Sequence, residues 1–332
     1  MNLYVHFPFC RRKCTYCALH SRAGSSLETR AKYVESIAKE VSTLNGKIST
    51  VYFGGGSPAL CDLRPIFSEL RPLLSPDCEF TVELHPLDVC EDTLSALKDG
   101  GVNRISMGMQ SLDDAVLKHM MRGYTFDEAE RAFRLIKGWF DNAGIDLIVG
   151  YPTESDYSRL GRLADWGLRH CSVYSLILEE RSILSHMLSN LTLPSDDAVL
   201  DRIRDISRFL SSSGLHRYEI SNYAASGFEC RHNMAVWRGE DYIGLGEGAH
   251  GRIGLKRTES GKATFVTAEE DEKERRLFRL RTIEGLDASN HPEWLPVLDK
   301  FTDEKLLEKS GVVYRLTERG TEVCDSILAE LV

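Results

Sequence analysis

Short apolar runs alternate with segments of helical periodicity over the first half of the chain. In Leu27–Leu44, for example, apolar residues recur every three or four positions, which is typical of an amphipathic helix. The apolar runs predict six strands: Leu3–Phe7, Ser49–Phe53, Glu79–Leu84, Val102–Gly108, Gly144–Val149 and Ser172–Ile177. Strands that alternate with helices predict a parallel sheet with the helices outside it.

The helices between these strands are predicted from the same periodicity. They are Leu27–Leu44, a segment through Ile66, Leu70 and Leu73, Glu91–Lys98, a segment through Leu112, Val116 and Met120, Phe126–Phe140, and Tyr157–Leu168. Thr125 and Glu128 have the spacing of a capping box at the start of Phe126–Phe140.

The repeat length favours an α/β fold of the partial (β/α)6 type, similar to an open TIM barrel; a doubly wound open sheet is the alternative. In both folds the chemistry lies at the carboxyl ends of the strands. The segments and residues expected there are Cys10–Cys17, Gly54–Ser57, Glu83, Gln110 and Asp146.

After Leu178 the alternation ends, and we expect three parts: a barrel over 1–180, an extension over 181–265 and a small C-terminal domain over 266–332. The extension is predicted to contain a helix, Asp196–Leu210, a strand, Arg217–Ile220, loops over Asn222–Gly251, and a hairpin within Arg252–Thr267. The C-terminal part resembles a winged helix, with helices Glu272–Thr282 and Asp303–Lys309, a strand Val312–Leu316 and a helix after Thr317.

Three cysteines, Cys10, Cys14 and Cys17, follow the first predicted strand within eight positions. Thiolates are preferred ligands of iron–sulfur clusters, and three of them leave one iron of a four-iron cluster open to a small molecule. The cationic run Arg11-Arg12-Lys13 would offset the cluster's negative charge. A zinc site is the alternative, because His20 would complete a Cys₃His ligand set.

The composition is that of an ordinary globular protein, with 42% apolar and 27% charged residues. A net charge of −9 argues against a general nucleic-acid surface, and no apolar run is long enough to cross a membrane. The chain begins with a strand rather than an export signal, and its other six cysteines are scattered singly. We therefore expect a cytoplasmic protein with reduced thiols.

Several polar residues could contact a ligand at the strand ends. The run Gly54-Gly55-Gly56-Ser57 would let backbone approach a ligand, or would simply form a tight turn. The carboxylates of Glu83 and Asp146 and the amide of Gln110 could accept hydrogen bonds or cap loops, and Arg122 could bind a carboxylate or lie at the surface. His232 and His250 could ligate iron or serve as structural histidines.

Taken together, these residues resemble the radical SAM superfamily. The resemblance covers nearly the whole chain and is carried by Tyr4–Cys10, the cysteine triplet, Gly54–Pro58, Gly101–Gly108, Asp146–Gly150, Tyr218–Tyr223, His232–Arg238 and Asp241–His250. Within the superfamily the chain is most similar to the branch of the oxygen-independent coproporphyrinogen III dehydrogenase HemN and the heme chaperone HemW. This resemblance implies a [4Fe–4S] cluster and S-adenosylmethionine (SAM) as cofactors, and replaces the zinc interpretation.

The family pattern also implies roles for individual residues. Cys10, Cys14 and Cys17 would ligate the cluster, and His232 would contact heme. The SAM pocket would be formed by Tyr4, Tyr16, Gly55, Gly56, Ser57, Glu83, Gln110, Arg122 and Asp146. The partners implied are heme, a heme-acceptor protein and an electron donor such as flavodoxin or ferredoxin.

Two features favour the chaperone over the dehydrogenase. Leu19 stands where the dehydrogenase has a further cysteine, and the chain lacks that enzyme's N-terminal extension. The chaperone motif His-Asn-x-x-Tyr-Trp is present as His232-Asn-Met-Ala-Val236-Trp237, with Val236 in place of tyrosine. The resemblance thus implies a HemW-like heme chaperone; a dehydrogenase, or a radical SAM enzyme with another substrate, is the alternative.

Overall fold

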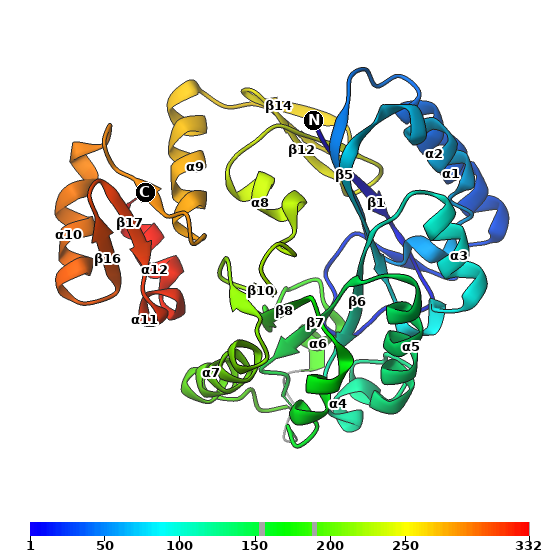
Figure 1. The fold of residues 1–332 in the computed structure, drawn as a ribbon, viewed down its shortest axis with the longest axis horizontal. Helices are drawn as coiled ribbons and strands as arrows, with labels where there is room; N and C mark the ends of the chain where they lie inside the picture. Colours follow the sequence, from blue (N-terminus) through cyan, green and yellow to red (C-terminus); the bar gives the residue numbers. More distant parts are fainter. Residues whose placement is uncertain (153–156, 188–190, 332) are drawn as a thin grey trace.

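The computed structural model describes residues 1–152, 157–187 and 191–331, and its centre is a curved sheet (Figure 1). The six predicted strands are β1 (Asn2–Phe7), β4 (Ile48–Gly55), β5 (Leu74–Leu84), β6 (Arg104–Gln110), β7 (Asn142–Val149) and β8 (His170–Ser175). They lie side by side in chain order, and all neighbours among them are parallel. This unbroken order confirms the partial barrel, because a doubly wound sheet reverses its strand order.

Helices cover the convex face of this sheet (Figure 1). They are α1 (Leu27–Val41), α2 (Arg64–Leu70), α3 (Glu91–Asp99), α4 (Asp114–His119) and α5 (Phe126–Trp139). The capping box of Thr125 and Glu128 is confirmed at the start of α5. The helix predicted over Tyr157–Leu168 is wrong in type, because the structure has 3₁₀ turns over Leu160–Trp166.

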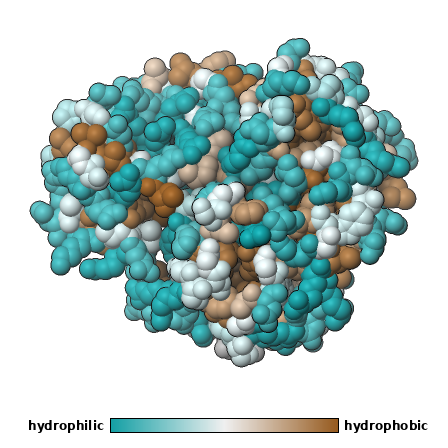
Figure 2. Space-filling view, in the orientation of Figure 1, coloured by the Kyte–Doolittle hydropathy of each residue, from teal (hydrophilic) through white to brown (hydrophobic). Residues whose placement is uncertain are grey.

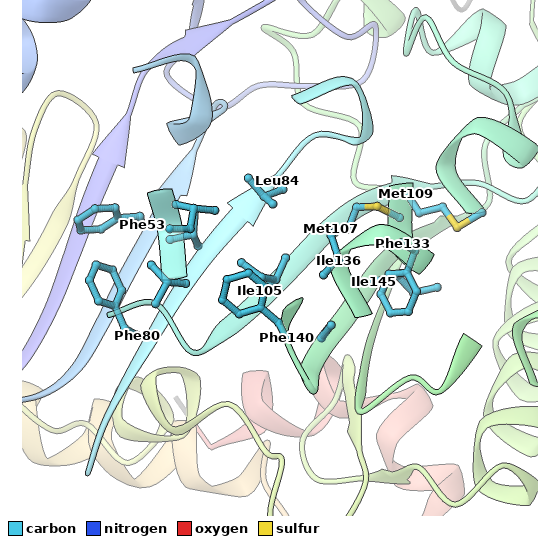
Figure 3. Packing of buried hydrophobic residues seen from close by; sticks show 14 of the residues in the cluster. Phe53, Phe80, Leu84, Ile105, Met107, Met109, Phe133, Ile136, Phe140 and Ile145 are labelled. Atoms are coloured by element: carbon cyan, nitrogen blue, oxygen red, sulfur yellow. The ribbon is translucent and has the colours of Figure 1, made fainter. Parts of the chain in front are cut away.

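The main core lies between the sheet and these helices. Phe53, Phe80 and Ile105 project from neighbouring strands, and Phe133 and Ile136 of α5 meet them from the helical layer (Figure 3). Alternate residues of each strand face this core, so the residues between them face the concave side. In the central part of β4, Val51 and Phe53 face the core, which leaves Thr50 and Tyr52 for the concave side.

The prediction that 222–251 consists of loops and turns is wrong. This segment holds β10 (Asn222–Ala224), α8 (Arg231–Trp237), β11 (Tyr242–Leu245) and the start of β12 (His250–Ile253). β11 pairs in parallel with β1, and β10 pairs antiparallel with β8 and with the two-residue strand β9 (His216–Arg217). These elements are too short to show a hydrophobic period, and the strands among them form because the existing sheet edges offer backbone partners.

Helix α8 lies on the concave side of the sheet, opposite the outer helices (Figure 1). Its first backbone N–H groups, of Arg231 and His232, donate to the carboxylate of Glu79 at 3.0 and 3.1 Å. Glu79 comes from β5 and is buried, as is Arg104 of β6. A buried carboxylate therefore holds the start of α8 inside the barrel.

The remaining part of the extension agrees with its predicted hairpin and helix. Strands β13 (Lys256–Glu259) and β14 (Lys262–Phe265) flank the turn at Ser260-Gly261, and α7 spans Asp196–Ser212. The short elements β2 (Phe9–Cys10), β3 (Arg22–Ala23) and α6 (Ile183–Met187) complete this half of the structure.

The C-terminal part has its own small core, built around Leu286, Leu298, Phe301 and Tyr314. Its elements are α9 (Ala268–Leu280), β15 (Leu286–Asp287), α10 (Leu295–Asp303), β16 (Leu307–Ser310), β17 (Val313–Leu316), α11 (Glu318–Glu322) and α12 (Cys324–Glu330). The predicted helix Asp303–Lys309 is wrong, because α10 ends at Asp303 and Lys305 adopts a positive φ of 60° before β16. The helix expected after Thr317 is divided at Val323.

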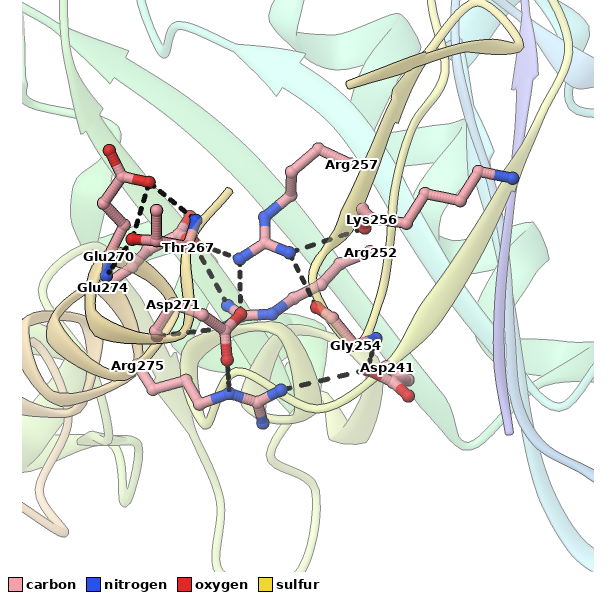
Figure 4. Close-up of polar contacts among 10 residues, drawn as sticks. All are labelled: Asp241, Arg252, Gly254, Lys256, Arg257, Thr267, Glu270, Asp271, Glu274 and Arg275. Carbon is pink, nitrogen blue, oxygen red and sulfur yellow. Dashed lines mark hydrogen bonds and ion pairs between the residues drawn. The ribbon is translucent and has the colours of Figure 1, made fainter. Parts of the chain in front are cut away.

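An ionic network joins the β12–β13 strands to α9 (Figure 4). The carboxylate of Asp271 accepts from Arg252 and Arg257 at 2.6 Å each and from Arg275 at 2.7 Å. The Asp271 side chain is 11% exposed and that of Arg252 only 4%. These three cations, against burial, hold the pKa of Asp271 well below its usual range.

Replacement of Asp271 by alanine is expected to lower the free energy of unfolding by roughly 2–3 kcal/mol, because it leaves the buried guanidinium of Arg252 with only Glu274, at 3.6 Å, as an anion among the described residues. Urea denaturation at neutral pH would measure this loss. Glu272→Ala is the matched control, since Glu272 is 58% exposed and pairs with Arg276 of the same helix. If Glu272→Ala lowers the free energy of unfolding as much as Asp271→Ala does, the ionic network does not stabilise the contact between β12–β13 and α9.

The described residues contain no helix with the length and apolar character needed to cross a membrane. The face seen in Figure 2 is mainly hydrophilic, and hydrophobic residues are visible in hollows near its centre.

Candidate functional site

Cys10, Cys14 and Cys17 lie at the carboxyl end of β1 and line one cavity of about 1170 Å³. All three are free thiols of intermediate burial. Burial raises the pKa of Cys10, and the two neighbouring thiols act in the same direction. The three thiols thus share a partly buried, accessible wall.

Backbone and hydroxyl contacts fix the loop that carries the cysteines. The hydroxyl of Thr15 hydrogen-bonds to that of Tyr151 at 2.8 Å, and its carbonyl accepts from the Leu184 N–H at 2.7 Å. The ammonium of Lys13 donates to the Leu19 carbonyl at 2.8 Å. The loop is therefore held at its centre and at its end, as a ligand loop requires.

The glycine run at the end of β4 lies directly against the residues before Cys10. The N–H of Gly56 donates to the Phe7 carbonyl, and that of Ser57 donates to the Phe9 carbonyl, both at 2.7 Å. A Cβ at Gly56 would lie 2.3 Å from the Phe9 oxygen, so no other residue fits there without movement. The N–H groups of Gly56 and Ser57 are therefore already bonded within the protein.

Two carboxylates face the cavity from β5 and β7. Glu83 accepts from the Tyr52 hydroxyl at 2.8 Å and from the Gly55 N–H at 3.1 Å. Asp146 accepts from the Ser106 hydroxyl at 3.0 Å. Removal from bulk water and the nearby charge of Asp146 raise the pKa of Glu83 to about 7, and burial also raises that of Asp146.

The raised pKa of Glu83 predicts a pH dependence of the cofactor-free protein. Between the ordinary glutamate pKa of 4.5 and the folded-state pKa of about 7 the folded state binds more protons, so stability falls as pH rises through this window. Glu83→Gln is expected to reduce the difference in unfolding free energy between pH 5 and pH 8 by roughly 2–3 kcal/mol. Urea denaturation at both pH values tests this, with exposed Glu28→Gln as control. An unchanged pH dependence in Glu83→Gln would contradict it.

Arg122 is buried beside the cysteines rather than exposed at the surface. Its guanidinium donates to the Cys14 sulfur at 3.3 Å, to the Gly108 carbonyl at 2.7 Å and to the Tyr124 hydroxyl at 3.0 Å. Gln110, at the end of β6, has a positive φ of 73°, an uncommon backbone conformation that is often found at functional sites.

The structure brings most of the predicted cofactor residues together. The cavity is lined by Tyr16, Gly55, Gly56, Ser57, Glu83, Gln110, Arg122 and Asp146, together with the three cysteines. Tyr16 packs beside Val116, Met120 and Tyr151. The contacts of these residues with SAM stay predictions. One cofactor can contact all of them only if they line the same cavity, and they do.

Tyr4 and His232 are not among the residues that line this cavity. The Tyr4 hydroxyl hydrogen-bonds to His6 at 3.0 Å. His232 is 4% exposed, hydrogen-bonds to Thr50 at 2.9 Å, and its ring centroid lies 5.3 Å from that of Tyr52. Burial and the charge of Arg104 lower the pKa of His232 to about 4. Its contact with heme stays a prediction, and His250 lies exposed at the start of β12.

The zinc alternative has no support from the geometry. Across the described ranges, no three His, Cys, Asp or Glu side chains gather as a site for one metal ion. The His20 ring faces Glu247 at 3.3 Å, and its carbonyl pairs with the His6 ring at 2.8 Å. The three thiols share one cavity wall, and the His20 ring that would complete a zinc site is directed to Glu247 instead.

Sequence reasoning missed Tyr52, His85 and Asp88, which also line the cavity. Tyr52 could have been found from the alternation along β4, which places it on the concave side with Thr50. Asp88 is buried and accepts from the Ser57 hydroxyl and from Arg11, so it links the glycine run to the cysteine loop. No sequence signal marks Asp88 beyond its place in the turn after β5.

Comparisons with known proteins agree with this geometry. The family profile of the radical SAM superfamily matches residues 4–165. The heme chaperone HemW of Lactococcus lactis is 35% identical over 269 residues, which cover 76% of this chain and 69% of that protein. HemW of Escherichia coli is 33% identical over 267 residues, covering 76% and 70%, and HemW of Bacillus subtilis is 29% identical over 99% and 100%.

The fold also has a solved counterpart. The structure of the coproporphyrinogen III oxidase HemN from Escherichia coli, described as a radical SAM enzyme, aligns with a TM-score of 0.84 at 20% identity, over 99% of this chain and 89% of that one. At this identity the likeness shows the fold alone. From the sequence relatives and the superfamily match together, the chain belongs to the radical SAM superfamily, in its HemN and HemW branch.

Proposed function

We propose that this protein is a HemW-like heme chaperone, which carries a [4Fe–4S] cluster and SAM and delivers heme to an acceptor protein. One observation carries the cofactor part: three thiols, a glycine run and two carboxylates open onto one cavity. The heme part rests on the relatives named heme chaperone HemW, which match about three quarters of the chain.

The residues of the cavity fit the two implied cofactors. Cys10, Cys14 and Cys17 would hold the cluster, and Arg122 would offset the negative charge of the thiolates. Glu83 and Asp146 would accept hydrogen bonds from the hydroxyl or amino groups of SAM, with Tyr16 against its adenine. When bound, the reduced cluster supplies the electron that cleaves a C–S bond of SAM.

A heme could enter the same cavity beside these cofactors. Pockets for one small molecule commonly span roughly 300–1,000 Å³, and this cavity measures about 1170 Å³. Its wall contains both apolar residues, such as Leu176 and Ile203, and cations. An amphipathic tetrapyrrole needs this combination.

The cationic residues of the cysteine loop would receive an electron donor. Arg11 is half-exposed, Arg12 is exposed, and both line the cavity mouth beside the thiols. An acidic flavodoxin or ferredoxin would be attracted to this edge. Its reduction of the cluster would then slow as salt screens the attraction.

Two incubations of the reconstituted protein test the proposed function. With ferric heme, we expect saturable binding by absorbance titration and transfer to an apo-hemoprotein. With coproporphyrinogen III, SAM and reductant, we expect no protoporphyrinogen. Conversion of the porphyrinogen over many turnovers would contradict the chaperone and favour the dehydrogenase. His232→Ala is expected to weaken heme binding, and unchanged binding in this variant would show that His232 is not a heme contact.

A further inference from the structure

The cavity extends well beyond the cysteines, toward the C-terminal part of the chain. Its far end is lined by Tyr174, Ile203, Arg217, Ile220, Arg281 and Cys324, which we call the outer chamber. These residues come from β8, α7, β9 and the turn after it, the end of α9, and α12. The barrel and the C-terminal part therefore form one ligand wall together.

Arg217 is a cation of this chamber held by neutral groups. Its guanidinium donates to the Thr321 hydroxyl at 2.8 Å and to the Tyr223 hydroxyl, and lies 5.0 Å from the centroid of the Tyr223 ring. The ion pairs found within the described part of the chain give it no carboxylate partner. Hydroxyls and an aromatic face position this charge, and Glu322, whose charge it also influences, is already paired with Arg204.

Arg281 has one exposed ion-pair partner, and the buried carboxylate of Glu219 also lies within its electrostatic reach. Arg281 donates to Asp325 at 3.2 Å, and the Asp325 side chain is 93% exposed, where an ion pair contributes little. Its Nε is buried without a hydrogen-bond partner among the described residues, and its guanidinium lies 4.8 Å from the Trp237 ring centroid. A buried donor without a partner costs free energy that an incoming acceptor would recover.

Arg204, a third arginine of the cavity wall, differs in this respect. Its guanidinium meets the two carboxylate oxygens of Glu322 at 2.7 Å each and Asp201 at 2.9 Å. Its charge is therefore already matched, and so is that of Glu322. Glu318 and Asp196 also line the cavity, and they are exposed.

We propose that Arg217 and Arg281 bind the propionate carboxylates of a tetrapyrrole whose ring lies against Ile203 and Ile220. Guanidinium groups recognise carboxylates through charge-assisted hydrogen bonds, and the apolar residues beside them would contact the ring. This inference rests on the proposed function, since it assumes that heme enters the cavity. It assigns the C-terminal part a direct role, because Thr321 positions Arg217 and Asp325 contacts Arg281.

The test compares ferric heme with its dimethyl ester, which lacks both carboxylate charges, by absorbance titration of reconstituted full-length protein. Wild type is expected to bind heme more tightly than the ester. Arg217→Leu and Arg281→Leu are each expected to weaken heme binding by about tenfold, the size of a charge-assisted hydrogen bond, and to leave ester binding unchanged. Arg217→Lys should fall between, and provides a second variant if leucine prevents folding.

Arg208→Leu is the matched control, since Arg208 lies on α7, pairs with Asp205 and does not line the cavity. Equal affinity of wild type for heme and ester, with unchanged heme binding in both variants, would overturn this inference and leave the heme chaperone standing. Loss of heme binding in His232→Ala, with heme binding unchanged in both arginine variants, would also overturn this inference. Absence of any heme binding by wild type would overturn the proposed function itself.

Discussion

Substitution of Cys14 by alanine is expected to leave the protein unable to retain an iron–sulfur cluster. Its sulfur lies 3.3 Å from the Arg122 guanidinium and lines the same cavity as Cys10 and Cys17, so the site would keep only two thiols. After anaerobic reconstitution, we expect iron to fall from about four per chain to near none, because a four-iron cluster needs its thiolate ligands. Iron and sulfide analysis with visible absorbance would measure this.

Cys61→Ala is the matched control for Cys14→Ala. Cys61 is also a partly buried free thiol, but it does not line the cavity. Burial raises its pKa to about 12, so it stays a protonated thiol at neutral pH. We expect the control to reconstitute like wild type. Full iron content in Cys14→Ala would show that the assigned ligand is wrong.

Substitution of Glu79 by alanine is expected to cause the largest loss of stability. Its carboxylate accepts from the N–H groups of Arg231 and His232, and the Cys230 thiol lies at 3.6 Å from it. Alanine would leave these donors, and the buried charge of Arg104, without their anion. The cost is roughly 3–5 kcal/mol, the range for breaking a buried charged network. Urea denaturation with circular dichroism would measure it.

Glu79→Gln separates charge from hydrogen bonding in this network. Glutamine keeps an oxygen acceptor of the same length and removes the charge, so a smaller loss is expected than with alanine. Burial lowers the pKa of the Arg104 guanidinium, whereas the nearby Cys230 and Glu79 raise it, so that the pKa lies above its usual value. If both variants unfold at the wild-type urea concentration, α8 is not anchored by Glu79.

The main sheet could be predicted from sequence because its strands are buried and separated by amphipathic helices. All six strand predictions from Leu3–Phe7 to Ser172–Ile177 overlap the observed strands β1 to β8 of the barrel. Short elements such as α8 and β11 could not be predicted from the sequence, because they form only against tertiary partners. The start of α8 is held by Glu79, more than 150 positions earlier, and no local pattern records that contact.

The residues of the candidate site that follow the ends of strands could be predicted from the sequence. The residues whose position depends on burial in the folded protein could not. Cys10, Gly56, Glu83 and Asp146 lie at or near the ends of their strands and meet at one cavity, as parallel strands require. Tyr4 and His232 lie beside Tyr52 and do not line the cavity. Their motifs carry no information about this position, because it depends on the fold. The burial of Arg122 also depends on the fold, since its partner Cys14 is remote in sequence.

An electron paramagnetic resonance spectrum of the reduced, reconstituted protein, recorded before and after adding SAM, tests the central claim most directly. If three cysteines leave one iron facing the cavity, the signal will change when SAM binds, at about four irons per chain. A spectrum that SAM does not alter, or one zinc per chain in place of iron, would contradict the account.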